Sequence, residues 1–282
     1  MFAIIDLHII QLYFMQIKNL KKLKINSKKL IVFDLDDTLA MSKTPMDQEM
    51  AGLIKELLAK KKVAVIGGGK YELFKWQFIS QLKTPSQLLK NLFLFPTCGS
   101  AFYRYNSSWK KVYAHLLSTT EKKNIRAAFA AVYKEMNYKD PKKVYGEVVE
   151  DRKSQMSFSP LGQDIATVLG KKGVQLKEEW RKKYDHIRME MAKRLKKHLP
   201  NLEVRVGGIT TIDVTMKGID KAYGVRQMEK HLKIKVKDMV FIGDSIFPGG
   251  NDYAAIKTGI DYIKIKGPED TKKIISQILQ AK

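Results

Sequence analysis

The chain has 282 residues, of which 44% are hydrophobic, so it is long enough for one large domain or two smaller ones. Its single cysteine, Cys98, excludes an intramolecular disulfide framework and is typical of a cytoplasmic protein. The formal net charge of +23 comes from lysines spread along the whole chain, which favours a solvated surface that attracts anionic substrates over a specific nucleic-acid partner.

The first segment, residues 1–17, is apolar but is interrupted by Asp6 and His8. It has neither the basic start and cleavage site of a signal peptide nor an unbroken span for a bilayer. We expect residues 1–27 to be an N-terminal extension that packs on the folded domain, or a segment included because the predicted start lies too far upstream. An interfacial membrane helix is the alternative, and no membrane span is expected.

Strands and helices alternate over the first hundred residues. Apolar runs with β-branched residues predict buried strands, and the i, i+3, i+4, i+7 spacing predicts helices. The expected order is a strand at 30–33, a helix at 47–61, a strand at 63–66, a helix at 70–82 and a strand at 92–95. This βαβαβ order predicts a doubly wound, Rossmann-like parallel sheet.

The middle of the chain has a different pattern, in which strands and helices do not alternate as βα units. We expect a hairpin at 101–105 and 109–113, helices at 119–136 and 176–199, and strands at 144–149, 155–159, 202–206 and 210–215. From residue 218 the α/β pattern returns, with helices at 219–232, 251–258 and 268–279 and strands at 239–242 and 262–265. The predicted fold is therefore an α/β core, residues 28–114 and 217–282, with an inserted α+β domain, residues 115–216, that contains an antiparallel sheet.

Acidic residues follow two of the predicted parallel strands. Asp34 and Asp36 end the first strand, Thr38 follows them, and Asp244 ends the strand at 239–242. If these strands are neighbours, Asp244 can complete a Mg²⁺ site with Asp34, because this ion prefers oxygen ligands. Two coincidental strand-end acids, or an acidic turn that caps a helix, are the structural alternatives.

One lysine near the start of a predicted helix is a candidate phosphate ligand. Lys221 opens the helix at 219–232, where the helix dipole disfavours a positive charge. A role with a phosphate accounts for this position better than a surface role does. Lys217 is the competing candidate.

The sequence Asp34-x-Asp36-x-Thr38 resembles the first motif of the haloacid-dehalogenase superfamily, and Gly243-Asp244 with Asn251-Asp252 resembles the fourth. The resemblance implies that Asp34 attacks phosphorus to form an aspartyl phosphate, that Asp36 is the general acid and base, and that Thr38 orients the loop. It also implies that Lys221 holds the phosphate and the nucleophile together. The implied Mg²⁺ ligands are Asp34, Asp36, Asp244 and Asp252.

Several segments resemble eukaryotic-type phosphomannomutases in one order over roughly residues 28 to 280, with a class IIB cap. They include Gly67-Gly68-Gly69, where many phosphatases of the superfamily begin with Ser or Thr, and residues 95–96, 157–162, 207–214, 220–221, 247–252 and 268–274. The implied substrate- and phosphate-binding residues are Gly67, Gly68, Gly69, Arg152, Thr211, Asp213 and Asn251. Gln163 stands where the family has another phosphate-binding arginine, and a neutral amide cannot replace a bidentate guanidinium.

The sequence therefore favours a Mg²⁺-dependent phosphohydrolase that acts on a small phosphorylated metabolite, a sugar phosphate above all, through an aspartyl phosphate. A phosphomannomutase-like mutase, which passes the same phosphoryl group to a sugar, is the alternative that Gln163 disfavours. A third hypothesis is a basic nucleic-acid-binding module with a vestigial acid cluster. Family members pair through their caps, so the resemblance also allows a homodimer through the cap.

Overall fold

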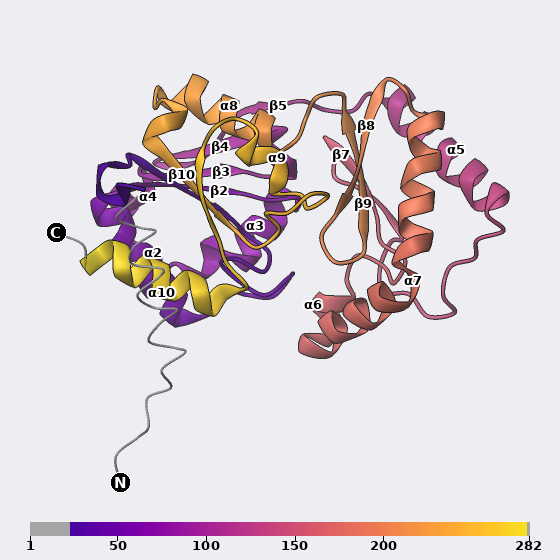
Figure 1. Ribbon diagram of the computed structural model, residues 1–282, viewed down its shortest axis with the longest axis horizontal. Coiled ribbons are helices and arrows are strands. Elements are labelled where there is room, and N and C mark those ends of the chain that lie inside the picture. The colour runs from indigo at the N-terminus through magenta and orange to yellow at the C-terminus, as the bar shows by residue number, and fades with distance from the viewer. Residues whose placement is uncertain (1–22, 281–282) are drawn as a thin grey trace, which may run out of the picture.

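The computed structural model describes residues 23–280, so the predicted extension 1–27 and its possible interfacial helix lie largely outside the described residues. The chain folds into an α/β core and a smaller cap, shown at the left and right of Figure 1. Within the described part of the chain, no helix is long and apolar enough to cross a membrane.

The core is built on a seven-stranded sheet in the order β11-β10-β1-β2-β3-β4-β5. Its strands are β1 (Leu30–Asp34), β2 (Lys62–Ile66), β3 (Leu92–Phe95), β4 (Ala101–Asn106), β5 (Ser108–Ala114), β10 (Met239–Gly243) and β11 (Asp261–Lys264). The five strands from β11 to β3 are parallel, and the predicted hairpin, β4 and β5, extends the sheet antiparallel to β3. The predicted doubly wound sheet is thus confirmed, with an antiparallel edge added.

Helices cover both faces of the core sheet (Figure 1). The helices are α2 (Gln48–Lys60), α3 (Tyr71–Gln77), α4 (Ser86–Leu89), α8 (Lys221–Leu232), α9 (Tyr253–Ile256) and α10 (Pro268–Gln280), with short 3₁₀ turns η1 (Ile25–Ser27), η2 (Ile79–Gln81), η3 (Thr97–Gly99) and η4 (Val236–Asp238). α2, α3, α4 and α10 bury apolar side chains against one face, and α8 and α9 against the other. Because both faces are buried, residues 30–33 of β1 and 239–242 of β10 are all apolar, which is why these strands could be predicted from the sequence.

The cap contains a four-stranded antiparallel sheet in the order β6-β7-β9-β8. Its elements are α5 (Thr119–Glu135), β6 (Val149–Asp151), β7 (Gln155–Phe158), α6 (Ile165–Leu169), α7 (Lys171–His198), β8 (Leu202–Gly207) and β9 (Thr211–Met216). Figure 1 shows this sheet between the core and the helices α5 and α7. The predicted inserted α+β module with an antiparallel sheet is confirmed.

The two faces of the cap sheet differ because side chains alternate along a strand. Met156 and Phe158 of β7 and Ile212 and Val214 of β9 pack with α5 and α7 in one apolar cluster. The alternate positions are polar, and Ser157 of β7 pairs in register with Asp213 of β9. These polar side chains are buried although they lie on the face opposite the apolar cluster.

Several sequence-based boundaries are wrong in detail. The helix expected at 70–82 ends at Gln77, and the helix expected at 251–258 covers only Tyr253–Ile256. The strand expected at 144–149 begins only at Val149, because Tyr145 forms backbone hydrogen bonds with the loop at Leu161 and Asp164. α7 begins at Lys171, earlier than the expected 176. α5 begins at Thr119, as expected, and Ser118 precedes it as the N-cap, forming a reciprocal capping box with Glu121.

Candidate active site

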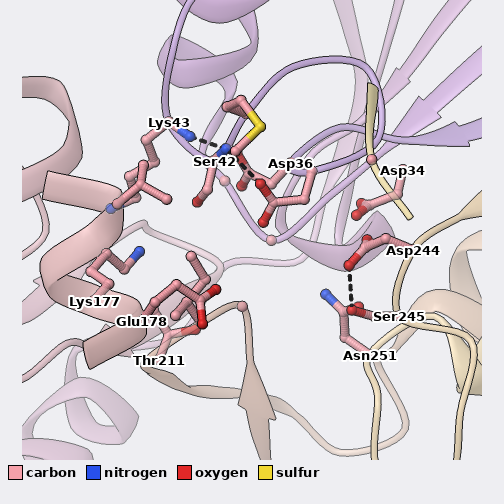
Figure 2. A pocket seen from close by; sticks show the side chains of 18 of the residues that line it. Asp34, Asp36, Ser42, Lys43, Lys177, Glu178, Thr211, Asp244, Ser245 and Asn251 are labelled. Carbon is pink, nitrogen blue, oxygen red and sulfur yellow. Dashed lines mark hydrogen bonds between the residues drawn. The ribbon is translucent and has the colours of Figure 1, made fainter. Parts of the chain in front are cut away.

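A cavity of about 430 Å³ lies between the core and the cap, which is within the size range of small-molecule sites. The residues that line it follow β1, β2 and β10 in the core and belong to β9 and α7 in the cap (Figure 2). The predicted site residues that line it are Asp34, Asp36, Gly68, Gly69, Arg152, Thr211, Asp213, Asp244 and Asn251. The chain therefore brings most of its predicted site residues to one place.

Lys221 forms the centre of a buried ion-pair group behind this cavity. Its side chain is 1% exposed, and Nζ donates hydrogen bonds to Oδ1 of Asp34 at 2.6 Å and to Oδ1 of Asp252. Asp220 caps α8 by accepting from the Tyr223 amide at 2.7 Å, which fixes Lys221 at the first helical position. Lys217, the competing candidate, is exposed and donates to the Pro200 carbonyl at 3.3 Å instead.

Asp34, Asp244 and Asp252 form a group of carboxylates that can share one metal ion. Each offers an oxygen, and these oxygens lie within 4.8 Å of one another. β1 and β10 are adjacent parallel strands, so their carboxyl ends place Asp34 beside Asp244. The Thr38 hydroxyl approaches Oδ1 of Asp244 at 3.5 Å, and the Ser245 amide donates to Asp252 at 3.0 Å.

This group contains more carboxyl groups than basic side chains. Burial raises the pKa of Asp34 well above its ordinary value, Lys221 opposes this, and Asp252 and Asp244 add to it. Burial alone lowers the pKa of Lys221, but Asp252 and Asp34 outweigh burial and raise it. One ammonium thus pairs with two of the three carboxyl groups, Asp34 and Asp252, and Asp244 has no basic partner in this group. An all-oxygen donor set with surplus negative charge fits a hard divalent cation such as Mg²⁺.

The side chain of Asp36 lies outside this group of three. Its Oδ1 accepts hydrogen bonds from the Lys43 amide at 2.8 Å and from Nε2 of Gln77 at 3.0 Å. Asp36 still lines the cavity, and Figure 2 shows it between Lys43 and Asp34. Its geometry is therefore that of a fixed carboxyl group beside the cavity. Its carboxylate is not one of the group of three, and the role of Asp36 as a metal ligand stays a prediction.

The three consecutive glycines occupy different surroundings. A Cβ at Gly67 would lie 3.6 Å from Oδ1 of Asp34 and 3.4 Å from Cβ of Leu35, so Gly67 packs beneath the nucleophile candidate and does not line the cavity. Gly68 and Gly69 do line it. The Gly68 carbonyl accepts hydrogen bonds from Arg152 at 2.6 Å and from Gln155 at 3.2 Å, both of the cap.

Arg152 is committed to neighbouring protein groups. Nε donates to Glu150 at 2.7 Å, one terminal nitrogen donates to the Gly68 carbonyl, and the other donates to Oε1 of Gln163 at 2.8 Å. Gln163 in turn donates from Nε2 to the Ser157 carbonyl at 2.8 Å. Arg152 therefore links the cap to the core at the edge of the cavity.

Asp213 and Thr211 line the cap side of the cavity. Asp213 accepts a hydrogen bond from the Ser157 hydroxyl at 2.6 Å. Burial raises the pKa of Asp213, and Arg152 partly offsets this. Asn251 lies on the other side, next to Ser245 in Figure 2.

Apart from Arg152, sequence reasoning missed the basic residues of the cavity, chiefly Lys43, Lys177 and Arg181. One signal was present in the sequence. Lys177 stands three residues after Val174 and three before Trp180, both of which are buried on α7. A lysine at that helical spacing lies on the inward face of the helix. Charged side chains are rarely buried there unless they have a partner.

Comparison with known proteins identifies the family. The model of the family "Eukaryotic phosphomannomutase" matches residues 50–281. A phosphomannomutase of Encephalitozoon cuniculi is 27% identical over 265 residues, which cover 90% of this chain and 95% of that protein. A phosphomannomutase of Saccharomyces cerevisiae is 28% identical over 256 residues, covering 88% and 93%.

Solved structures with lower identity share the fold. A Plasmodium falciparum IMP-nucleotidase structure has a TM-score of 0.68 at 17% identity and covers 94% of this chain and 71% of its own. The C-terminal domain of a Candida albicans trehalose-6-phosphate phosphatase has a TM-score of 0.61 at 14% identity and covers 93% and 96%. These likenesses support the haloacid-dehalogenase fold with a cap. From the family match over most of its length, the chain belongs to the eukaryotic phosphomannomutase family.

Proposed function

We propose that this chain is a Mg²⁺-dependent phosphosugar mutase that transfers a phosphoryl group between hydroxyls of a hexose through an aspartyl phosphate on Asp34. The observation that carries the proposal is the buried contact of Lys221 with Asp34 and Asp252 in a member of this family. Relatives that cover nearly the whole chain are named phosphomannomutases, which supports a sugar as the phosphoryl acceptor. The mutase, which was the alternative on sequence grounds, thereby becomes the main hypothesis, and the phosphohydrolase becomes the second.

In the proposed reaction, Asp34 and Asp36 divide the chemistry. A carboxylate oxygen of Asp34 attacks phosphorus, the bond from phosphorus to the sugar oxygen breaks, and Asp36 gives its proton to that oxygen. In the reverse transfer, Asp36 takes the proton of another sugar hydroxyl as this hydroxyl attacks the aspartyl phosphate. The hydrogen bonds from Lys43 and Gln77 hold the Asp36 carboxyl group in place for both steps.

The remaining residues bind and orient. Asp34, Asp244 and Asp252 would hold Mg²⁺. The ion would neutralise the negative charge of these carboxylates and of the phosphoryl oxygens. Lys221 fixes the orientation of Asp34 through its 2.6 Å hydrogen bond. We assign contacts with phosphate to the backbone amides of Gly68 and Gly69 and to Asn251, and contacts with the sugar to Thr211 and Asp213, which line the same cavity.

A phosphohydrolase is the second candidate, and one observation favours it. Gln163 replaces an expected phosphate-binding arginine, and its amide is occupied by Arg152, Lys43 and the Ser157 carbonyl. Both candidates share the aspartyl phosphate and differ in whether water or a sugar hydroxyl receives the phosphoryl group.

The test is to incubate the protein with mannose 1-phosphate, Mg²⁺ and a catalytic amount of a sugar bisphosphate, and to follow products by ³¹P NMR. Mannose 6-phosphate is the expected product. Asp34→Asn is expected to lower the rate by roughly 10³-fold or more, because the nucleophile is lost. Inorganic phosphate as the sole product would favour the hydrolase, and an Asp34→Asn protein with the wild-type rate would remove the assignment of the nucleophile.

A further inference from the structure

One buried lysine of the cavity has no use in the chemistry described above. Lys177 of α7 is 3% exposed and lines the cavity. Among the described residues, no hydrogen bond or ion pair engages its ammonium group. A buried ammonium without a counter-ion is costly, so its position indicates a ligand that supplies the negative charge.

The basic side chains of the cavity lie mostly on the side away from Asp34, and Glu178 lies among them (Figure 2). Figure 2 shows Lys177 on the cap helix and Lys43 facing it from the core, whereas Asp34 and Asp244 lie at the far side. Arg181, one turn beyond Lys177 on α7, also lines the cavity, and it pairs with Glu178 at 3.2 Å. Positive charge is therefore gathered away from the nucleophile.

The acidic groups near Lys177 do not fully offset the cost of burying its charge. Asp36 and Asp37 attract the ammonium, but burial is the larger effect and lowers the pKa of Lys177 below its ordinary value. Glu178 lines the cavity next to it and is paired with Arg181. An anion that enters the cavity would replace the lost hydration of this ammonium.

The neighbouring basic groups are already engaged within the protein. Lys43 donates to the side-chain oxygen of Gln163 at 2.9 Å and also to its backbone carbonyl. Arg152 donates to Glu150, Gly68 and Gln163. Among the described residues, Lys177 is thus the buried basic residue on the cap side of the cavity whose N–H donors are free to bind a ligand.

We propose that Lys177 binds the second phosphate of a bisphosphorylated sugar, at the side of the cavity away from Asp34, with Lys43 and Arg181 adding positive charge. This inference rests on the proposed function, because a mutase must hold a sugar that carries phosphates at both ends during transfer. It accounts for Gln163: the positive charge absent at that position is supplied from α7 instead.

The test compares the binding of a sugar with one phosphate and with two. The full chain carrying Asp34→Asn, which cannot form the aspartyl phosphate, is titrated by calorimetry in the presence of Mg²⁺ with glucose 1-phosphate and glucose 1,6-bisphosphate. The readout is the ratio of the two dissociation constants. Adding Lys177→Gln is expected to lower the preference for the bisphosphate by about tenfold, the loss of one charge-assisted hydrogen bond to phosphate.

Two further variants separate binding from a general loss of charge. Lys182→Gln removes an exposed lysine from the same helix and is expected to keep the ratio. Lys177→Arg keeps the positive charge and is expected to keep most of the wild-type preference for the bisphosphate. A ratio that responds equally to Lys177→Gln and Lys182→Gln would overturn the proposal. A lower melting temperature of Lys177→Gln would also count against it, because removal of an unpaired buried ammonium should stabilise the fold.

The outcomes distinguish this inference from the proposed function. If the wild-type protein converts mannose 1-phosphate to mannose 6-phosphate but the ratio is insensitive to residue 177, the second-phosphate site is wrong and the mutase stands. If the ratio depends on residue 177 but only inorganic phosphate is released, the mutase fails and the anion site is supported.

Discussion

At the scale of single residues, the site depends on one buried ammonium. Lys221 is 1% exposed and pairs with Asp34 and Asp252, which are 5% and 0% exposed. Burial of each charge is costly by itself, and the group is tolerated because the charges and hydrogen bonds offset one another. In the proposed reaction the same contact would orient the oxygen of Asp34 for attack, so stability and activity would depend on one contact.

Replacement of Lys221 should therefore damage both properties. We expect Lys221→Met to lower the free energy of unfolding by about 3–5 kcal/mol, because two buried carboxylates lose their partner. The rate of phosphoryl transfer should fall by roughly 10²–10³-fold, the usual effect of removing one charge-stabilising group. Urea denaturation and the ³¹P assay measure the two effects.

The matched control is Lys217→Met, which removes the exposed lysine that competes for the same role on sequence grounds. We expect its stability to remain within about 0.5 kcal/mol of the wild type, as for other surface changes. A Lys217→Met protein that loses transfer while Lys221→Met keeps it would reverse the assignment.

At the scale of elements, α10 is attached to α2 by charge as well as by apolar contact. Lys272 of α10 contacts Asp47 at 2.9 Å, Glu49 at 2.7 Å and Glu269 at 2.9 Å. Asp47 is also the N-cap of α2 and accepts from the Met50 amide at 2.8 Å. Burial alone raises the pKa of Asp47, but the hydrogen bonds from Met50 and Lys272 outweigh it and lower the pKa.

A lowered carboxylate pKa predicts a direction for the pH dependence of stability. The contribution of Asp47 is present above its unfolded pKa of about 3.9 and is lost as the pH falls through its lower folded pKa. Asp47→Asn keeps a capping side chain but removes the charge, so the wild type should exceed it near pH 7 by less than ~1 kcal/mol, because the carboxylate is half exposed. Urea midpoints between pH 7 and pH 2.5 should show the gap closing. A gap that widens in acid would contradict this account.

Elements with a strong local pattern were predictable, and those fixed by contacts with distant segments were not. The hairpin β4–β5 followed from its alternating residues and turn. The segment before Val149 has strand-like composition, yet it bonds to the loop at Leu161 and Asp164 instead of to β7. Tertiary contact overrides β propensity there.

At the scale of the whole molecule, the cap is tied to the core across the cavity. Arg152 donates to the Gly68 carbonyl at 2.6 Å, and Lys70 of the core pairs with Glu150 of the cap at 2.5 Å. Lys43 of the core donates to Gln163 of the cap. Because Arg152 also bonds Glu150 and Gln163, these contacts form one connected group that joins the core to the cap at the edge of the cavity.

Loss of the central contact should open the molecule. We expect Arg152→Ala to increase the radius of gyration measured by small-angle X-ray scattering and to speed proteolysis of the core–cap connections. The exposed Arg126 of α5 provides the control Arg126→Ala, which should leave both unchanged. If Arg152→Ala weakens binding of glucose 1-phosphate without either change, Arg152 acts as a phosphate ligand and not as a link between core and cap.

The sequence by itself determined the parallel core, the inserted cap and the strand-end acids Asp34 and Asp244, because apolar runs and carboxylates adjacent in the chain are local features. Only the tertiary structure decided which charges meet. Lys221 contacts Asp34 across 187 residues of sequence, and Lys177 on the inward face of α7 meets the cavity only because the cap packs against the core. Pairing and burial of charge depend on distances between elements, which no local pattern contains.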